Sequence, residues 1–191
     1  TVHVRQDCGV NGYSLNAQSS FTTLCSPLVA PIAENFASGT GTTPPSCWTN
    51  PLLSGGERWA FATTPLTGNY PSPVNDPTSG NTRVAWIDAS SDVLVNELTT
   101  PYIDRSALTS TTAGFKFLSN NTNNAILHTI NMDVWNGTAW VNMITYSGNN
   151  AAWIPLEAVV PGGIPTITRF RIVAVRNPAG TTADYFYNDL F

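Results

Sequence analysis

The chain has 191 residues and a formal net charge of −4; 10% of its residues are charged and 42% are hydrophobic. This length fits one large domain, or one domain with a fragment of another, and the hydrophobic content argues against a disordered chain. Lys116 is the sole lysine and no cluster of basic residues occurs. Nucleic acid and anionic membrane surfaces are therefore poor partners.

Ser, Thr, Asn, Gly and Pro dominate the polar residues. These residues compete with helical hydrogen bonding, so the composition favours short strands and tight turns. No apolar run approaches the ~20 residues that a membrane helix needs. The first residues carry neither an initiator Met nor the apolar segment of a signal peptide, so we expect a processed product or a piece of a longer polypeptide.

Runs typical of β-strands recur along the chain. In chain order, we expect strands at residues 2–6, 20–23, 32–36, 58–64, 82–88, 96–103, 113–118, 126–135, 138–146, 152–160, 167–176 and 185–191. Two of these runs place apolar side chains on one face: Ile130, Met132 and Val134 in the first, and Phe170, Ile172 and Ala174 in the second. Asn136-Gly137 predicts a two-residue hairpin turn, because both residues tolerate positive φ. The pattern predicts an all-β, antiparallel β-sandwich.

Two segments interrupt this pattern. Residues 37–57 are rich in Gly, Thr, Pro and Ser, and residues 65–81 carry four prolines. Long loops inside a compact domain are usually functional or held by another group.

The N-terminal residues resemble the last two strands of a fibronectin type III module of secreted Bacteroidetes-type proteins. The resemblance is carried by Val4-Arg5-Gln6-Asp7-Cys8-Gly9 and by Ser20-Phe21-Thr22-Thr23-Leu24-Cys25. It implies that residues 1–27 are the C-terminal part of one module and that residues 28–191 form the next. The alternative is that residues 1–27 supply the first strands of the main domain.

From Ile32 onward the chain resembles the MAM-like and gingipain-type cleaved-adhesin jelly rolls. The matching motifs occur in the family's order: Glu34-Asn35-Phe36, Cys47-Trp48-Thr49, Trp59, Gly80-Asn81-Thr82-Arg83-Val84-Ala85, Glu97 to Asp104, Trp140, Trp153 and Asn188-Asp189-Leu190-Phe191. The resemblance implies an antiparallel jelly roll with Trp48, Trp59, Trp140 and Trp153 in its core. It also implies a non-catalytic adhesion or accessory domain of a large secreted or cell-surface protein, with neighbouring domains and a surface glycan or protein as partners.

The resemblance further implies a structural Ca²⁺. Glu34 and Asp189 would supply carboxylates from the two terminal strands, and Asn81 or nearby carbonyls would complete a shell of hard oxygen ligands. The chain stops before the family's final Asp-Asp, so any ligand from that pair is missing. The alternative is that Glu34 and Asp189 are surface strand residues.

The remaining aromatic residues indicate a second possible role. Trp86, Trp135, Tyr70, Tyr102 and Tyr146 have no core position in the family pattern, and Trp86, Trp135, Tyr70 and Tyr146 are the candidates to stack on sugar rings. This is the alternative function, a carbohydrate-binding module attached to a secreted hydrolase or protease. Trp86 and Trp135 lie within predicted strands and fit a core equally well.

Catalytic signals are absent from the sequence. No Gly-x-Ser-x-Gly, His-Glu-x-x-His or phosphate-binding glycine loop occurs. His3 and His128 are the two histidines, and the cysteines are expected to be structural, so the chain has too few ligands for a zinc site. We expect His128 to be packed or on the surface. The sequence therefore does not predict an enzyme.

The odd cysteine count indicates a secreted protein, extracellular or on the cell surface, with at least one disulfide. Under the fibronectin resemblance, Cys8 pairs with a cysteine at the start of its own module. Cys25 opens the next module and pairs with Cys47.

Overall fold

The structure is a computed structural model. It describes residues 2–15, 17–19, 25–53, 58–63, 83–88, 95–119, 128–148, 153–177 and 185–190, without the side chains of residues 2–4, 17–19, 88, 119 and 185–190. The expected strand at residues 20–23 lies outside these residues. Within the described part, no helix is long and apolar enough to span a membrane.

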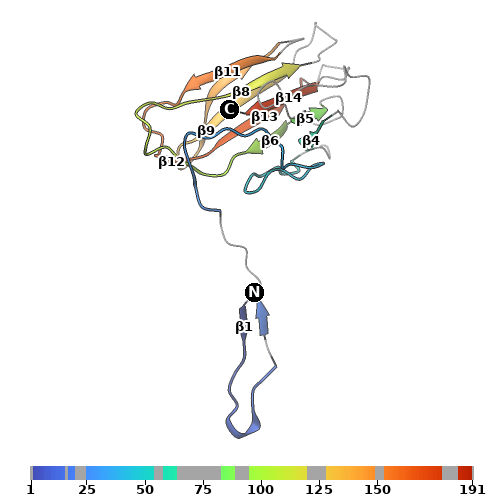
Figure 1. Cartoon of the computed structure of the whole chain (residues 1–191), viewed down its shortest axis with the longest axis vertical. Coiled ribbons are helices and arrows are strands. Elements are labelled where there is room, and N and C mark those ends of the chain that lie inside the picture. Colours follow the sequence, from blue (N-terminus) through green and yellow to red (C-terminus); the bar gives the residue numbers. More distant parts are fainter. Residues whose placement is uncertain are drawn as a thin grey trace.

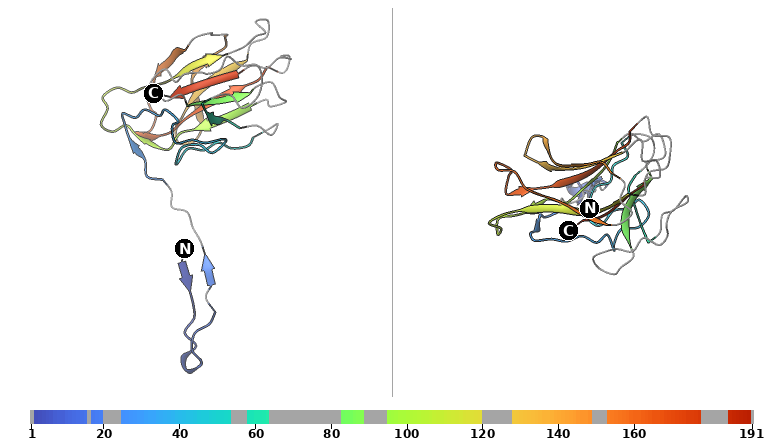
Figure 2. Two further views of the ribbon diagram at one scale, coloured as in Figure 1. Left: turned by 45° about the vertical axis from the view of Figure 1, so that its right-hand side comes forward. Right: turned by 90° about the horizontal axis from the view of Figure 1, so that it is seen from above.

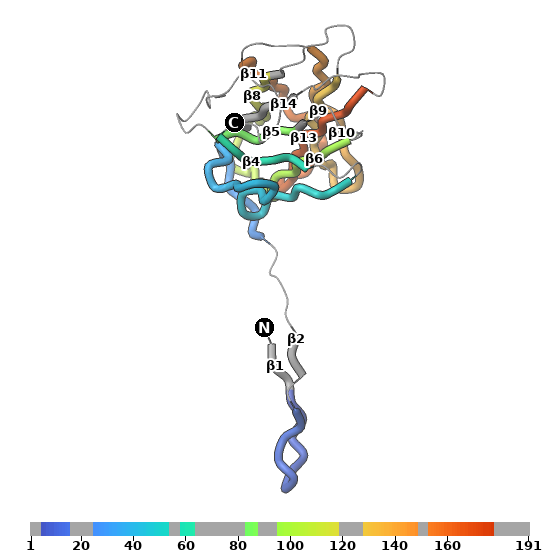
Figure 3. The backbone as a smooth tube through the Cα atoms, turned by 90° about the vertical axis from the view of Figure 1, so that its right-hand side faces the viewer, coloured from blue at the N-terminus to red at the C-terminus, as the bar shows by residue number. Residues whose placement is uncertain are grey.

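The body of the molecule is a β-sandwich (Figure 1). One sheet has four strands in the order β10-β9-β13-β6, and the other has five in the order β11-β8-β14-β5-β4. Figure 3 shows the labelled strands of the two sheets on opposite sides of the sandwich. The bounds in the first sheet are Trp140–Tyr146, Thr129–Trp135, Phe170–Val175 and Val95–Thr99; in the second they are Ile154–Val159, Thr112–Ser119, Tyr185–Leu190, Val84–Asp88 and Ala60–Ala62. All pairings in these two sheets are antiparallel, which confirms the predicted fold class.

The core lies between the two sheets and follows from the alternation of side chains along each strand. The apolar positions expected to share a face are all buried: Ile130, Met132, Val134, Phe170, Ile172 and Ala174. From the opposite sheet, Phe115, Phe117 and Ile87 pack into the same cluster. The sequence pattern therefore identified the inward faces of β9 and β13 correctly.

Aromatic residues close one part of this core. Phe36, Trp59 and Phe61 are at most 1% exposed, and the Phe36 ring lies 5.3 Å from Trp48 and 5.6 Å from Phe61. Phe36 has φ 58°, which is unusual for a residue with a side chain. Its buried ring holds this conformation, and its backbone N–H donates to Glu34 Oε1 at 2.6 Å. In place of the expected strand, residues 32–36 are irregular apart from a single bridge residue at Glu34, and a turn follows at residues 37–38.

The hairpin between β9 and β10 differs from the expected two-residue turn. Its loop spans residues 136–139, and Asn136 Oδ1 accepts the backbone N–H groups of Thr138 and Ala139 at 2.9 and 2.8 Å. Gly137 has φ 101°, so the glycine serves the positive-φ position that the motif indicated. The hairpin was predicted correctly and its loop length was not.

Two small sheets complete the described structure. β12 (Ile167–Thr168), β7 (Ile103–Asp104) and β3 (Leu28–Val29) form a three-stranded sheet. β1 (Val2–Val4) and β2 (Ala17–Ser19) form a two-stranded sheet, with the 3-10 helix η1 (Gly9–Asn11) in its loop. This hairpin projects away from the sandwich (Figure 1, Figure 2).

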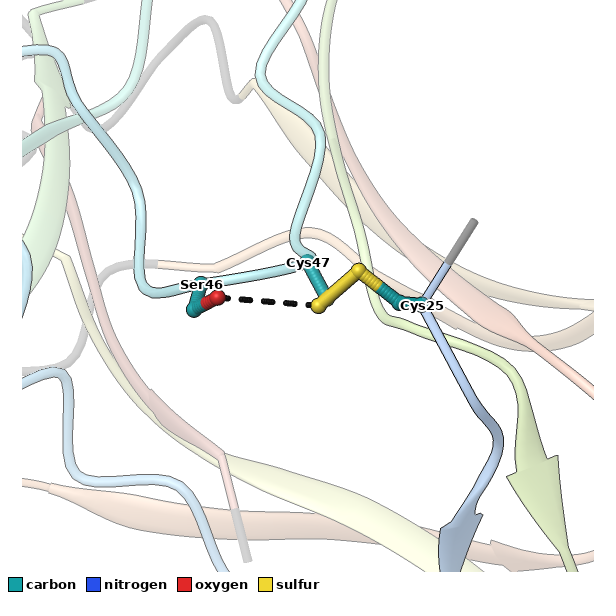
Figure 4. Close-up of a disulfide and its surroundings, with 3 residues drawn as sticks. All are labelled: Cys25, Ser46 and Cys47. Carbon is teal, nitrogen blue, oxygen red and sulfur yellow. Dashed lines mark hydrogen bonds between the residues drawn. A yellow bond between two sulfur atoms is a disulfide. The ribbon is translucent and has the colours of Figure 1, made fainter. Parts of the chain in front are cut away.

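The predicted disulfide between Cys25 and Cys47 is confirmed, with Cα atoms 5.9 Å apart (Figure 4). Ser46 Oγ lies 3.6 Å from Cys47 Sγ. Cys8 is free and exposed in the described structure. The bond ties the segment before β3 to the Pro-rich loop that carries Trp48.

Candidate functional site

The outward face of the four-stranded sheet carries the candidate site. Successive residues of a strand point to opposite faces, so Trp135 lies opposite the buried Val134, and Arg169 and Arg171 lie opposite the buried Phe170. Trp135 faces Trp140 across the β9–β10 pair, and Trp135 N–H donates to Arg169 O at 3.0 Å. Strands β9 and β10, together with the residue just before β13, therefore place two tryptophans and an arginine side by side.

Arg169 lies among aromatic rings at one end of this face. Its guanidinium carbon is 5.1 Å from the ring centroid of Tyr102, 5.6 Å from that of Trp135 and 5.4 Å from that of Trp140. The two tryptophans contact each other edge to face, with centroids 5.3 Å apart. Each cation–π contact at a site of this kind stabilises the arrangement by about 0.5–1 kcal/mol or more. Tyr102 is 40% exposed, so part of its ring remains accessible to a ligand.

Arg171, two residues further along β13, lies in a network of ion pairs. Its Nε donates to Asp133 Oδ2 at 2.8 Å and its Nη1 to Glu97 Oε2 at 3.0 Å. Asp133 Oδ1 accepts Asn142 Nδ2–H at 3.0 Å. The Asp133 side chain is 10% exposed and that of Glu97 22%, so these pairs are partly shielded from water. The network joins β6, β13, β9 and β10.

This face combines aromatic rings with a fixed array of hydrogen-bonding groups, which is the chemistry that recognises sugars. A sugar ring packs its C–H groups on aromatic surfaces, and its hydroxyls bond to Arg, Asp and Asn side chains. Asp133 and Glu97 are both ion-paired with Arg171, and these pairs fix the orientation of the three side chains.

The structure does not bring the predicted sugar-stacking residues together. Trp135 is on the outward face described above. Trp86 is 5% exposed and packs with Val84 in the other sheet, so its ring offers almost no surface to a ligand. Tyr146 packs against the core, its ring 5.6 Å from Phe117. Tyr70 lies outside the described residues.

Trp48 and Trp59 are buried, as the family resemblance implied. Trp140 was expected in the core and is instead half-buried on the outward face, because its partner Trp135 points away from the core. Trp153 is also only half-buried and packs beside Trp86.

Of the three predicted Ca²⁺ ligands, only the Glu34 side chain is described. One of its carboxylate oxygens accepts the Phe36 N–H, which leaves the other oxygen for an ion. Asn81 and the Asp189 side chain lie outside the description, and the remaining side chains contain no group of three or more His, Cys, Asp or Glu placed to hold a metal. Glu34 is therefore compatible with an ion, and the Ca²⁺ site stays a prediction.

The residues that sequence reasoning missed are Trp140, Asp133, Glu97, Arg169 and Arg171. For Asp133 and Arg171 the available signal was the same alternation that identified the core. The residues between Phe170, Ile172 and Ala174, and between Met132 and Val134, are the ones that point outward.

A cavity of about 300 Å³ lies among residues that include Ile32, Ile103, Leu108 and Phe170. Its walls are mainly apolar, and the Arg105 guanidinium at this place already donates to Thr111 Oγ1 and to the carbonyl of Ile164. The Arg105 Nε is buried without an acceptor among the described residues, and Phe170 is the single aromatic residue in the cavity lining, whereas three aromatic rings meet on the outward face.

No protein-family model matches this sequence, and no curated protein does so significantly. Solved structures do match. The K3 cleaved adhesin domain of Lys-gingipain from Porphyromonas gingivalis W83 superposes with a TM-score of 0.59 at 12% identity, over 84% of this chain and 95% of that one. The carbohydrate-binding module TmCBM61, solved with β-1,4-galactotriose, gives 0.52 at 16% identity, over 83% and 94%.

A third match is a structure of carbohydrate-binding modules described as promiscuous in specificity and as members of a β-sandwich superfamily. It gives a TM-score of 0.51 at 13% identity, over 94% of this chain and 68% of that one. This chain shares their β-sandwich fold. The resemblance to the cleaved-adhesin domain is thus confirmed at the level of the fold. No finding bears on the fibronectin resemblance of residues 1–27, which stays a prediction.

Proposed function

We propose that this chain is a non-catalytic binding domain of a secreted or cell-surface multidomain protein, and that it binds a glycan on the outward face of the four-stranded sheet. The observation that carries the proposal is the cluster of Tyr102, Trp135, Trp140 and Arg169 beside the ion-paired Arg171. Rigid rings next to oriented polar groups form a site that needs little rearrangement on binding.

The structural neighbours support a binding role. One is an adhesin domain, and two are carbohydrate-binding modules, one of them solved with a galactotriose. An adhesion domain and a carbohydrate-binding module attached to a secreted hydrolase or protease differ in the protein to which they belong. Both need the same kind of binding site. A glycan-binding face serves both, and a protein on a surface is the alternative ligand.

Two further parts of the proposal concern context. The Cys25–Cys47 disulfide supports an oxidising, extracellular location. The separate pairing of β1 with β2 supports the assignment of residues 1–27 to a preceding module, with the domain itself at 28–191. Cys25 nonetheless belongs covalently to the sandwich, because its partner Cys47 lies there.

The test is a glycan array followed by calorimetry on the glycans that bind. Tyr102→Ala and Trp135→Ala should each weaken binding by about tenfold or more, since ~1.4 kcal/mol of lost contact corresponds to a factor of ten. Tyr13→Ala is the matched control. Tyr13 is also an exposed tyrosine beside an arginine, but it lies in the N-terminal hairpin.

Unchanged glycan affinity in both aromatic variants would show that the glycan binds somewhere other than this face. Silence across plant, algal and host glycans would count against glycan binding altogether and favour a protein ligand. A hydrolase or lyase activity that a single carboxylate substitution abolishes would overturn the non-catalytic assignment.

A further inference from the structure

Two arginines, Arg169 immediately before β13 and Arg171 within it, lie on the outward face of the sheet and have different partners. Arg171 donates to two carboxylates, those of Glu97 and Asp133. Arg169 has no carboxylate partner among the described residues, and its contacts there are the three aromatic rings of Tyr102, Trp135 and Trp140.

The Arg169 guanidinium is also short of hydrogen-bond acceptors. Its Nε is buried and has no acceptor within the described part of the chain, and no hydrogen bond from its terminal nitrogens is found there either. A guanidinium carries five N–H donors in a planar fork, and an unpaired donor away from water costs about 1–3 kcal/mol. The aromatic rings hold the cation in place without neutralising it or accepting in-plane hydrogen bonds.

We propose that Arg169 recognises an anionic group on the glycan, the carboxylate of a uronic acid or a sulfate ester. The inference rests on the proposed function and names its ligand class. The planar fork of arginine binds such anions through two parallel hydrogen bonds, which are stronger than bonds to a neutral hydroxyl.

Local charge favours this assignment to Arg169 over Arg171. Glu97 and Asp133 together outweigh the single charge of Arg171, so an anion near that end of the face meets two carboxylates. Their oxygens are turned toward Arg171, whose guanidinium carbon also lies 4.6 Å from the Trp140 ring centroid. The rings of Tyr102 and Trp135 lie against Arg169. An anionic substituent therefore binds at the aromatic end, where its sugar ring also meets the exposed part of Tyr102.

The probes are two pairs of polymers that differ in charge and share a backbone. Polygalacturonate is compared with its carboxyl-reduced form, and dextran sulfate is compared with dextran. The first pair tests a carboxylate and the second a sulfate. We expect at least tenfold tighter binding of the charged member in one pair, and we expect that preference to shrink as salt rises from about 0.05 M to about 0.5 M, because salt screens exposed charges.

Arg169→Gln should reduce the ratio of the affinities for the charged and the neutral polymer to about one, whatever the variant does to binding of the neutral polymer itself. Arg5→Gln is the matched control. Arg5 also stacks on a tyrosine, with its guanidinium carbon 4.0 Å from the Tyr13 ring, and its loss changes net charge equally. Circular dichroism and melting of Arg169→Gln show whether the sheet stays folded, and the salt series on the unmodified protein tests the proposal without any substitution.

Equal, salt-independent binding of charged and neutral polymers would overturn the anionic preference and leave glycan binding intact. A preference that Arg5→Gln removes as fully as Arg169→Gln would reflect overall charge and would also overturn it. Binding of no polymer, together with silence on the glycan array, would instead refute the proposed function.

Discussion

His128 shows how burial sets the chemistry of a single residue. Its side chain is buried just before β9, and its Nδ1 accepts the backbone N–H of Asn177 at 2.7 Å. Burial lowers the pKa of His128 below its usual 6.5, and the positive charge of Arg176 lowers it further. The sequence left His128 either packed or on the surface, and the structure shows it packed, with its imidazole accepting a hydrogen bond just after the end of β13.

This depressed pKa predicts acid sensitivity. Below pH ~6.5 the unfolded chain binds a proton at His128 that the folded chain refuses, so the free energy of unfolding falls as pH drops toward the folded pKa. Above pH ~6.5 the contribution is complete and flat. His128→Asn keeps an acceptor near Nδ1 and removes the titration, so it should lose less stability than the unmodified protein between pH 7.5 and pH 5, as measured by urea unfolding.

His3 provides the control, because it is the other histidine and lies in the projecting hairpin. His3→Asn should retain the full acid sensitivity. Parallel pH profiles for His128→Asn and the unmodified protein would show that other groups cause the acid response.

At the scale of elements, the Cys25–Cys47 bond ties an otherwise irregular segment to the sandwich. It closes a loop with a sequence separation of 22 residues, and Cys47 adopts φ 71° within it. A loop of this size restricts the unfolded chain enough to stabilise the fold by about 3 kcal/mol. We expect Cys25→Ser combined with Cys47→Ser to lower the free energy of unfolding by about that amount in denaturant titrations.

Cys8→Ser is the matched control and should leave stability unchanged, since Cys8 is exposed and unpaired in the described structure. A reductant should affect the unmodified protein and not the double variant. Peptide mapping without reduction that joined Cys8 to Cys25 would contradict the assignment.

Strand β13 shows what periodicity reveals and what it omits. Its inward residues were predicted as core from their spacing alone, and they are buried. The outward Arg171, and Arg169 just before the strand, acquire their roles from partners on β9, β10 and β6, which lie up to 74 residues away in sequence. Spacing within one strand gives the face of a residue, whereas its neighbours depend on strand order, which local sequence does not encode.

For the whole molecule, calcium is a testable source of stability. If Glu34 supplies one oxygen to Ca²⁺, the ion stabilises the folded state by ~2.7 kcal/mol when it is 100-fold above its dissociation constant. Glu34→Gln retains an acceptor for the Phe36 N–H but loses the charge. The variant should therefore melt like the unmodified protein in chelator and lack its rise in melting temperature with calcium.

Glu157→Gln, a change at an exposed acid on β11, should keep the calcium response. If Glu34→Gln loses the same stability with and without calcium, the role of Glu34 is limited to its hydrogen bond with the Phe36 N–H.

The fold was largely predictable because most strands alternate cleanly, and most expected runs from residue 58 onward coincide with single strands within a few residues. Two do not: the run 96–103 is divided between β6 and β7, and the run 167–176 between β12 and β13, which belong to different sheets. The exceptions have physical causes. Leu28–Val29 was missed because two exposed residues form a strand only through their parallel pairing with β7. Residues 32–36 were read as a strand because their apolar pattern does not reveal the positive φ of Phe36.

The candidate site was less predictable than the fold. Trp135 was a candidate from its residue type, but Trp140 was assigned to the core because a family pattern fixes position in sequence and not the direction of a side chain. Tyr102 and Arg169 come together across 67 positions of sequence, and nothing local to either residue indicates the contact.

Strand β14, at residues 185–190, lies in the middle of its sheet, between β8 and β5 (Figure 1). During synthesis, β8 and β5 therefore emerge with facing edges that have no partner until the last residues of this sequence leave the ribosome. Folding of this sheet waits for that insertion, and until then two open edges are exposed to pairing with other chains. Removal of β14 would therefore also separate β11 and β8 from β5 and β4, which would divide one sheet into two.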